Sequence, residues 1–189
     1  MNIYDALSKD HRKFEQLLDK IISESKSDND SWKTHLDELR REVIAHAHAE
    51  ESVLYNALRE EGESQKLVAH GYGEHAMAET EIRTLGLAKL VDITWTGLAE
   101  KLAKDLRHHI QEEESEIFAA ARKVFSDEEA TQMGSAFERL KTLMLPDGDS
   151  PMASSIDLVA NLLPPRLSAR FREKEAELAK KRGNSHAHP

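Results

Sequence analysis

Apolar side chains recur at spacings of three and four residues along most of this chain. The first such row, in residues 3–25, consists of Leu7, Phe14, Leu18 and Ile21. Residues at this spacing share one face of an α-helix, so the row predicts an amphipathic helix that packs against others. Similar rows predict three more long helices, at residues 31–60, 64–85 and 92–124.

A fifth helix is expected after these four. Ser126 and Glu129 have the spacing of a capping box, which predicts a helix over residues 126–145 that covers one face of the bundle. Short connections between long amphipathic helices favour antiparallel neighbours. We therefore predict an all-α fold, an up-down-up-down four-helix bundle with additional C-terminal helices.

The chain divides into two parts on this pattern. Residues 1–145 are expected to form the helical bundle with its covering fifth helix. Residues 146–189 are expected to hold a proline-broken connection, a highly charged helix over residues 166–181 and a tail that contains His186 and His188.

The second and fourth predicted helices carry the same motif, 63 residues apart. His46 is followed four residues later by Glu50, and His109 is followed four residues later by Glu113. The first and third helices add one histidine each, His11 and His75, at an offset of 64. Two similar hairpins of this kind would pack around a pseudo-twofold axis, and the polar side chains would lie on that axis.

These six polar residues occupy positions where the helical pattern expects core side chains. A single histidine in such a row is more often an ordinary core residue than a ligand. Four histidines and two glutamates together are different, because an unpaired buried carboxylate costs several kcal/mol or takes up a proton. A bound cation removes that cost, so the pattern predicts a metal site.

Three further residues are candidate ligands. Glu79 lies four residues after His75, and Glu15 holds the equivalent place in the first hairpin. Either could instead be an ordinary surface charge. Tyr55 could direct its phenolate to a metal, although its repeat partner Phe118 favours a core aromatic role.

Two glutamates beside the motifs are expected to support the ligands from behind. Glu51 and Glu114 follow the motif glutamates directly, so the helical step turns them away from the cluster. A dry pocket beside the cluster is expected from Phe14, Leu54, Ile117 and Phe118.

Composition narrows the chemistry. The chain has no cysteine, which excludes disulfides, iron–sulfur clusters and thiolate zinc sites, so nitrogen and oxygen must hold any metal. A formal net charge of −9 argues against a nucleic-acid partner. The sequence shows neither an apolar run of roughly 20 residues nor a signal peptide, so we expect no membrane association and a cytoplasmic location.

The combined motif of four histidines and two glutamates resembles the hemerythrin-like HHE cation-binding domain, over residues 3–125. The resemblance implies a non-haem di-iron centre whose two ions are oxo- or hydroxo-bridged, with iron expected ahead of zinc or manganese. Its ligands would be His11, His46, Glu50, His75, His109 and Glu113, with the two glutamates as bridges. Oxygen-carrying members of the family have a fifth histidine where this chain has Glu79, which argues against simple oxygen carriage.

The resemblance implies that the protein binds or turns over a small oxidant: dioxygen, peroxide or nitric oxide. A peroxide-decomposing, catalase-like activity is one form of this function. Two alternatives stay open. The chain could be an iron-binding or sensing module that meets a protein partner, or self-associates, through its charged C-terminal helix, or it could be a structural bundle stabilised by a metal.

Overall fold

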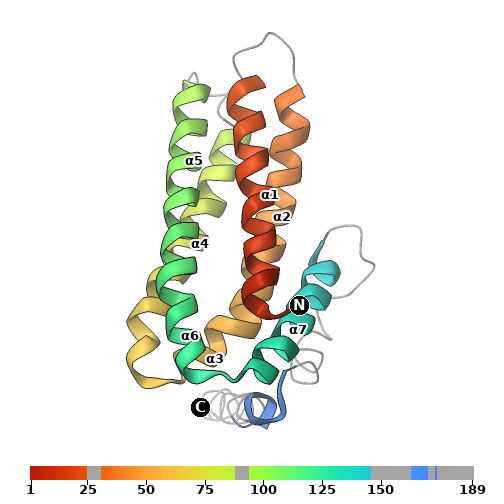
Figure 1. The fold of residues 1–189 in the computed structure, drawn as a ribbon. Helices are drawn as coiled ribbons and strands as arrows, with labels where there is room; N and C mark the ends of the chain where they lie inside the picture. The colour runs from red at the N-terminus through yellow and green to blue at the C-terminus, as the bar shows by residue number, and fades with distance from the viewer. Residues whose placement is uncertain (25–30, 88–93, 146–162, 170–172, 174–189) are drawn as a thin grey trace, which may run out of the picture.

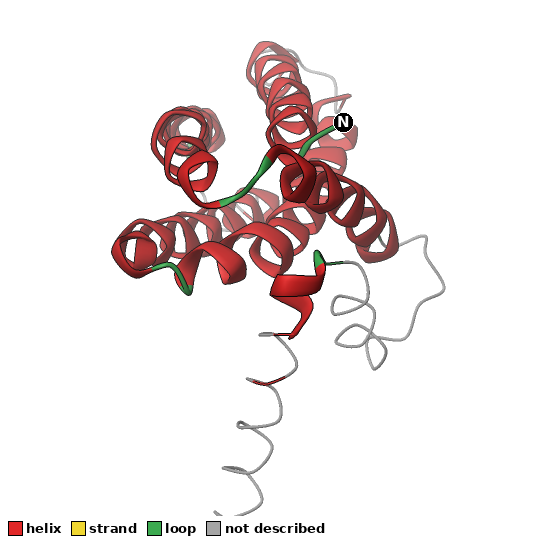
Figure 2. Ribbon diagram, turned by 60° about the horizontal axis from the view of Figure 1, so that its bottom comes forward, coloured by secondary structure: helices red, strands yellow, loops and turns green. Residues whose placement is uncertain are grey.

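The computed structural model describes residues 1–24, 31–87, 94–145, 163–169 and 173. Their regular elements are all helices (Figure 2). The N-terminal hairpin consists of α1 (Ile3–Glu24) and α2 (Ser31–Glu50), which continues through the π-helical segment η1 (Glu51–Tyr55) into α3 (Asn56–Arg59). The second hairpin consists of α4 (Gln65–Leu87) and α5 (Trp95–Glu112), which continues through a second π-helical segment, η4 (Glu113–Ile117), into α6 (Phe118–Val124).

The two hairpins pack into one bundle, with α1 against α5 and α2 against α4 (Figure 1). Neighbouring helices therefore run in opposite directions, and the predicted up-down-up-down four-helix bundle is confirmed. Gly62 connects the hairpins with a φ of 46°, a left-handed conformation that favours glycine, and it begins the 3-10 turn η2 (Gly62–Ser64). The predicted start of the fourth helix, at residue 92, lies outside the described residues.

The predicted fifth helix is α7 (Asp127–Met144), which packs on α1 and α2. Its capping box is present: the Ser126 hydroxyl accepts a hydrogen bond from the Glu129 backbone N–H, and the Glu129 carboxylate accepts one from the Ser126 N–H. Gly134 lets this helix lie close to the N-terminus, because a Cβ there would stand 2.5 Å from the Met1 carbonyl oxygen.

Residues 163–169 pack against the end of the bundle formed by α3, α6 and α7 (Figure 1). Leu163 and Leu167 are buried in the core there, and Arg166 pairs with Glu129. Residues 146–162 and most of the predicted helix at 166–181 lie outside the described residues. None of the described helices is long and apolar enough to cross a membrane.

The core consists of two apolar clusters. One surrounds Leu7, Leu54 and Phe118 and includes the buried face of α7; the other surrounds Phe14, Leu39 and Leu102. The second reaches the end of the bundle where Trp32 and Trp95 pack against each other, with ring centroids 4.1 Å apart and ring planes tilted by 50°. The predicted ligands belong to neither cluster, and they form a buried polar layer in the bundle.

Candidate metal centre

One histidine from each of the four long helices enters the polar layer. His11 comes from α1, His46 from α2, His75 from α4 and His109 from α5, and all four are buried. The glutamates of the repeated motif complete the layer; Glu50 is 0% exposed and Glu113 is 1% exposed. The helical spacing and the pseudo-twofold repeat thus bring all six predicted ligands together, while their metal binding stays a prediction.

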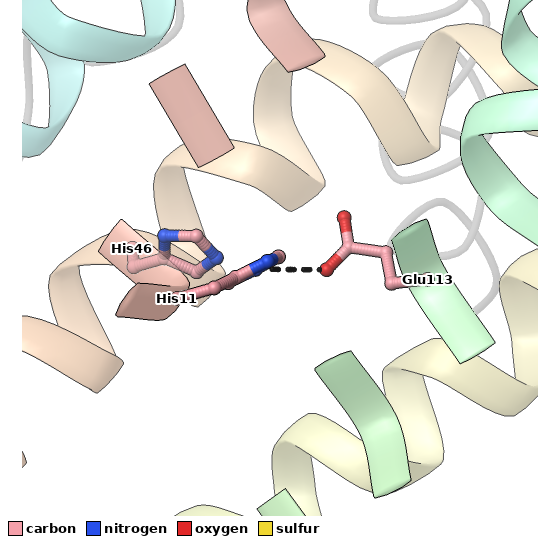
Figure 3. Close-up of side chains that lie close together, drawn as sticks. All are labelled: His11, His46 and Glu113. Carbon is pink, nitrogen blue, oxygen red and sulfur yellow. Dashed lines mark ion pairs between the residues drawn. The ribbon is translucent and has the colours of Figure 1, made fainter. Parts of the chain in front are cut away.

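Each glutamate lies between histidines of the two hairpins. The Glu113 Oε2 atom is 3.2 Å from His11 Nε2 and 3.6 Å from His109 Nε2. Figure 3 shows this carboxylate facing the His11 ring, with His46 beside it. The Glu50 Oε2 atom is likewise 3.4 Å from His75 Nε2 and 3.6 Å from His46 Nε2. The arrangement suits carboxylates that bridge two ions.

Every histidine turns its Nε2 atom inward because a carboxylate holds its Nδ1 atom from behind. The four contacts span 2.9–3.0 Å and pair His11 with Glu114, His46 with Asp10, His75 with Glu51 and His109 with Glu74. Such a carboxylate fixes the tautomer and the ring orientation of a metal-binding histidine and makes it a stronger donor.

Two of these supporting carboxylates were expected and two were not. Glu51 and Glu114 make the contacts that their positions in the sequence suggested. Asp10 and Glu74 had been assigned no role. A signal for them exists, because an acidic residue directly precedes the histidine in both Asp10-His11 and Glu74-His75.

Several of the inward-facing atoms lack hydrogen-bonding partners, whereas the Nε2 atoms of His75 and His109 lie within hydrogen-bonding distance of each other, at 3.2 Å. Both carboxylate oxygens of Glu50 and of Glu113, and the Nε2 atoms of His11 and His46, are buried and have no hydrogen-bonding partner of acceptable geometry among the described residues. His11, His46 and Glu113 also offer three ligand atoms within 4.8 Å of one another. Burying polar atoms without partners is costly, and cations between them would satisfy them, so these residues fit a metal centre.

The layer shifts the proton affinities of its histidines in opposite directions. Burial lowers the pKa of His46 to about 4, although Asp10 accepts a hydrogen bond from its ring. Burial also acts to lower the pKa of His11, but the carboxylates of Glu113 and Glu114 outweigh it and raise that pKa to about 9. At neutral pH and without metal, His11 is therefore the protonated member of the pair.

The two central glutamates titrate as a pair. Burial, and then the charge of Glu113, raise the pKa of Glu50 well above its ordinary value of 4.5. Burial alone would raise the pKa of Glu113 too, but its contacts with Glu50 and His11 hold that pKa well below the usual range. Without a metal, the pair therefore keeps one proton at neutral pH.

The backbone changes its winding at both motifs. The π-helical segments Glu51–Tyr55 and Glu113–Ile117 begin where the two motifs end. In the first segment Val53, Leu54 and Tyr55 all lie inside the bundle. Such segments often mark functional sites.

A pocket opens onto the histidines from one side of the polar layer. Phe14, Val43, Leu106 and Ile110 are among the apolar residues that line it, together with the four ligand histidines. Of the pocket residues expected from the sequence, Phe14 is therefore correct. Leu54, Ile117 and Phe118 lie in the other apolar cluster, because the seam position that they share does not tell which side of the layer they face.

The three additional candidate ligands, Glu79, Glu15 and Tyr55, make other contacts. The Glu79 side chain is partly exposed and bonds to Arg83 on its own helix, and Glu15 similarly pairs with Arg12. Tyr55 is fully buried and stacks on the His75 ring at 5.2 Å between centroids, as a core aromatic would. Its hydroxyl has no hydrogen-bonding partner in the described part of the chain.

A second group of metal-type side chains lies at the surface beside His109. It consists of His70, Glu74 and Glu112, and the His70 side chain is 60% exposed. Glu74 contacts His70 with one oxygen at 3.6 Å and holds His109 with the other.

Comparisons with known proteins agree with this geometry. The sequence profile of the family described as hemerythrin HHE cation binding domain matches residues 2–121. A DNA nickase of Nostoc sp. is 29% identical over 147 residues, which is 75% of this chain and 40% of the nickase. An uncharacterized hemerythrin-like protein of Schizosaccharomyces pombe is 29% identical over 143 residues, which is 74% of this chain and 68% of that protein. No solved structure gives a significant match.

Proposed function

This chain belongs to the hemerythrin HHE cation-binding family, and we propose that it holds two iron ions in the polar layer and binds or turns over a small oxidant there. The ligands would be the four histidines, with Glu50 and Glu113 as bridges. When bound, iron would supply a Lewis acid and a redox couple. Six protein side chains do not fill two six-coordinate ions, which leaves positions for solvent or substrate.

The observation that carries this proposal is the orientation of the four histidines. All four direct Nε2 inward, and each is held at Nδ1 by a separate carboxylate. A bundle that needed only core histidines would have no reason to bury the carboxylates of Glu50 and Glu113 at its centre without hydrogen bonds from the described residues. This pattern therefore favours a metal centre over a purely structural polar layer.

The pocket beside the histidines suits a small, uncharged oxidant. Its apolar lining, which includes Phe14, Val43 and Leu106, limits water near the site. We infer that peroxide is the best candidate, because its disproportionation to water and dioxygen is balanced without an outside reductant. The two anionic bridging carboxylates would also stabilise ferric iron, and this would weaken reversible binding of dioxygen.

The test compares two histidines that lie two residues apart on α2. His46 is buried in the layer, whereas His48 is exposed. Protein reconstituted with ferrous iron, without a histidine tag, should contain about two irons per chain and release oxygen from hydrogen peroxide. His48→Ala should behave as the wild type does, and His46→Ala should lose iron and most of the oxygen release. Equal oxygen release from both variants and from free iron would refute the enzymatic proposal.

A second candidate function is phosphodiester cleavage, favoured by the similarity to the DNA nickase. This chain spans 40% of that relative's length, and its net charge of −9 opposes contact with DNA phosphates. Two bridged ions could nevertheless stabilise the attacking and leaving oxygens. The same preparations, incubated with supercoiled plasmid, should convert it to the nicked form only if this function is present, and His46→Ala should abolish the conversion.

A further inference from the structure

The supporting carboxylates differ between the two halves of the centre. The first half consists of His11 and His46, supported by Glu114 and Asp10. The second half consists of His75 and His109, supported by Glu51 and Glu74. The pseudo-twofold repeat gives both halves the same types of ligand, and the groups behind the histidines distinguish the halves.

Both carboxylates of the first half share their charge with a cation. The Asp10 Oδ2 atom lies 3.0 Å from His46 Nδ1 and also accepts a hydrogen bond from the Lys141 ammonium at 2.7 Å. Lys141 is only 9% exposed and also bonds to Glu42. In the same way, Glu114 Oε1 contacts His11 Nδ1 at 2.9 Å and accepts a hydrogen bond from Arg12 at 2.5 Å.

The carboxylates of the second half have no such partner. Among the residues that the structure describes, no lysine or arginine forms an ion pair with Glu51 or Glu74; their charged contacts are histidines. Two features of the chain cause this asymmetry. The repeat offset places Ala76 where the first hairpin has Arg12. Lys141 comes from α7, which packs on α1 and α2 and lies beyond the residues matched by the family profile.

The difference bears directly on metal binding. A carboxylate that accepts the Nδ1 proton of a ligand histidine strengthens the Nε2 atom as a donor. A cation on the same oxygen draws that charge away, and its own positive charge opposes a nearby metal ion. Lys141 and Arg12 act on His46 and His11 through the carboxylates, so they are positioning residues and not ligands.

We propose that the two metal positions are inequivalent: the position at His75 and His109 binds its ion tightly, and the position at His11 and His46 is the labile one. This inference rests on the proposed function, because it requires two ions. It adds the order in which they bind. The labile position would be the one that exchanges or loses its ion first.

The test is a titration of metal-free protein with zinc, followed by nitrogen-15 resonances of the histidine rings and by calorimetry. We expect the first equivalent to shift the His75 and His109 signals. The second should shift His11 and His46, with an affinity lower by roughly tenfold or more, the range over which groups behind metal ligands act. Zinc avoids redox side reactions and takes the same donor atoms.

Matched variants test the effects of the Arg12 and Lys141 side chains separately. Arg12→Gln removes a side chain that is 52% exposed. It should raise the zinc affinity of the position at His11 and His46 about severalfold. Ala76→Arg adds the missing arginine at an exposed position behind the second half and should weaken the tighter site. Both should fold normally. Lys141→Met should have the largest effect, and Lys141→Arg should restore wild-type behaviour.

Several outcomes would overturn the inequivalence: first binding at His11 and His46, equal filling of both halves, or unchanged affinities in both Arg12→Gln and Ala76→Arg. The stoichiometry tests the proposed function separately. One zinc per chain at saturation would refute the two-ion centre. If that single ion lay at His75 and His109, the higher affinity of this half would still be supported, and an ion at His11 and His46 would refute it.

Discussion

Replacing Glu50 by glutamine should stabilise the metal-free protein while weakening its hold on metal. Glu50 is fully buried beside Glu113, and burial together with that neighbouring charge raises its pKa well above 4.5. In the unfolded chain the carboxyl ionises near its ordinary value, so folding at neutral pH requires Glu50 to take up a proton. Glutamine has nearly the same shape and needs no proton.

The size of the effect follows from the pKa difference. A folded pKa above the unfolded one gives a contribution that is fully present below pH 4.5 and lost as the pH rises toward the folded pKa. Each pH unit in this window costs about 1.4 kcal/mol, so Glu50→Gln should gain up to about 3 kcal/mol at pH 7. For a chain of this length that maximum corresponds to a rise in Tm of roughly 6–12 °C.

The assay is thermal unfolding of chelator-treated protein at several pH values. The gain should be largest near pH 7 and should fall to about 0.4 kcal/mol near pH 4.5, where the carboxyl is half protonated in the unfolded chain and protonated in the folded one. Glu138→Gln on the surface of α7 is the matched control and should change stability by less than about 0.5 kcal/mol. A Glu50→Gln protein that is less stable than the wild type at pH 7, or a gain that is as large at pH 4.5 as at pH 7, would refute the reasoning.

Two further predictions concern His11 and the packing against Tyr55. Because the pKa of metal-free His11 is about 9, a metal ion bound there at pH 7 must displace its proton, and apparent zinc affinity should rise by at least about tenfold per pH unit from 7 toward 9. Calorimetry in buffers of different ionisation enthalpy should detect about two released protons for the filled centre, one from His11 and one from the Glu50–Glu113 pair. No proton release would contradict this. Gly71→Ala would place a Cβ 2.6 Å from the Tyr55 hydroxyl, and because that ring is fully buried we expect a loss of about 1–3 kcal/mol in unfolding free energy. Gly73→Ala has open space and should be neutral or stabilising, and equal effects of both substitutions would show that the contact with Tyr55 is unimportant.

The fold and the ligand layer could be predicted from the sequence because both depend on regular periods. A spacing of three and four residues fixes which face of a helix is buried, and it treats His46 in the same way as Leu39 or Val43. The 63-residue repeat then places matching histidines at one depth. Nothing beyond the helical period is needed for these conclusions.

The supporting carboxylates depend on how the helices are rotated against one another, which the period does not determine. Asp10 lies next to a ligand in sequence, yet it serves His46 of the neighbouring helix. Glu51 crosses to the other hairpin to reach His75. The Asp10–Lys141 contact spans 131 positions of the chain, and only the packing of α7 creates it.

The position of the polar layer explains how the bundle can hold unpaired carboxylates and still fold. Large apolar clusters lie around it, with Leu7 and Leu54 in one and Phe14 and Leu39 in the other, and each ties several helices together. The unfavourable burial of Glu50 is therefore offset by packing in which it takes no part. Mutations in either cluster should lower the stability of the bundle, whereas Glu50→Gln in the layer should raise the stability of the metal-free protein and weaken metal binding. The carboxylates behind the histidines connect stability with metal affinity. Lys141 of α7 bonds to Asp10, and Asp10 in turn holds the ring of His46.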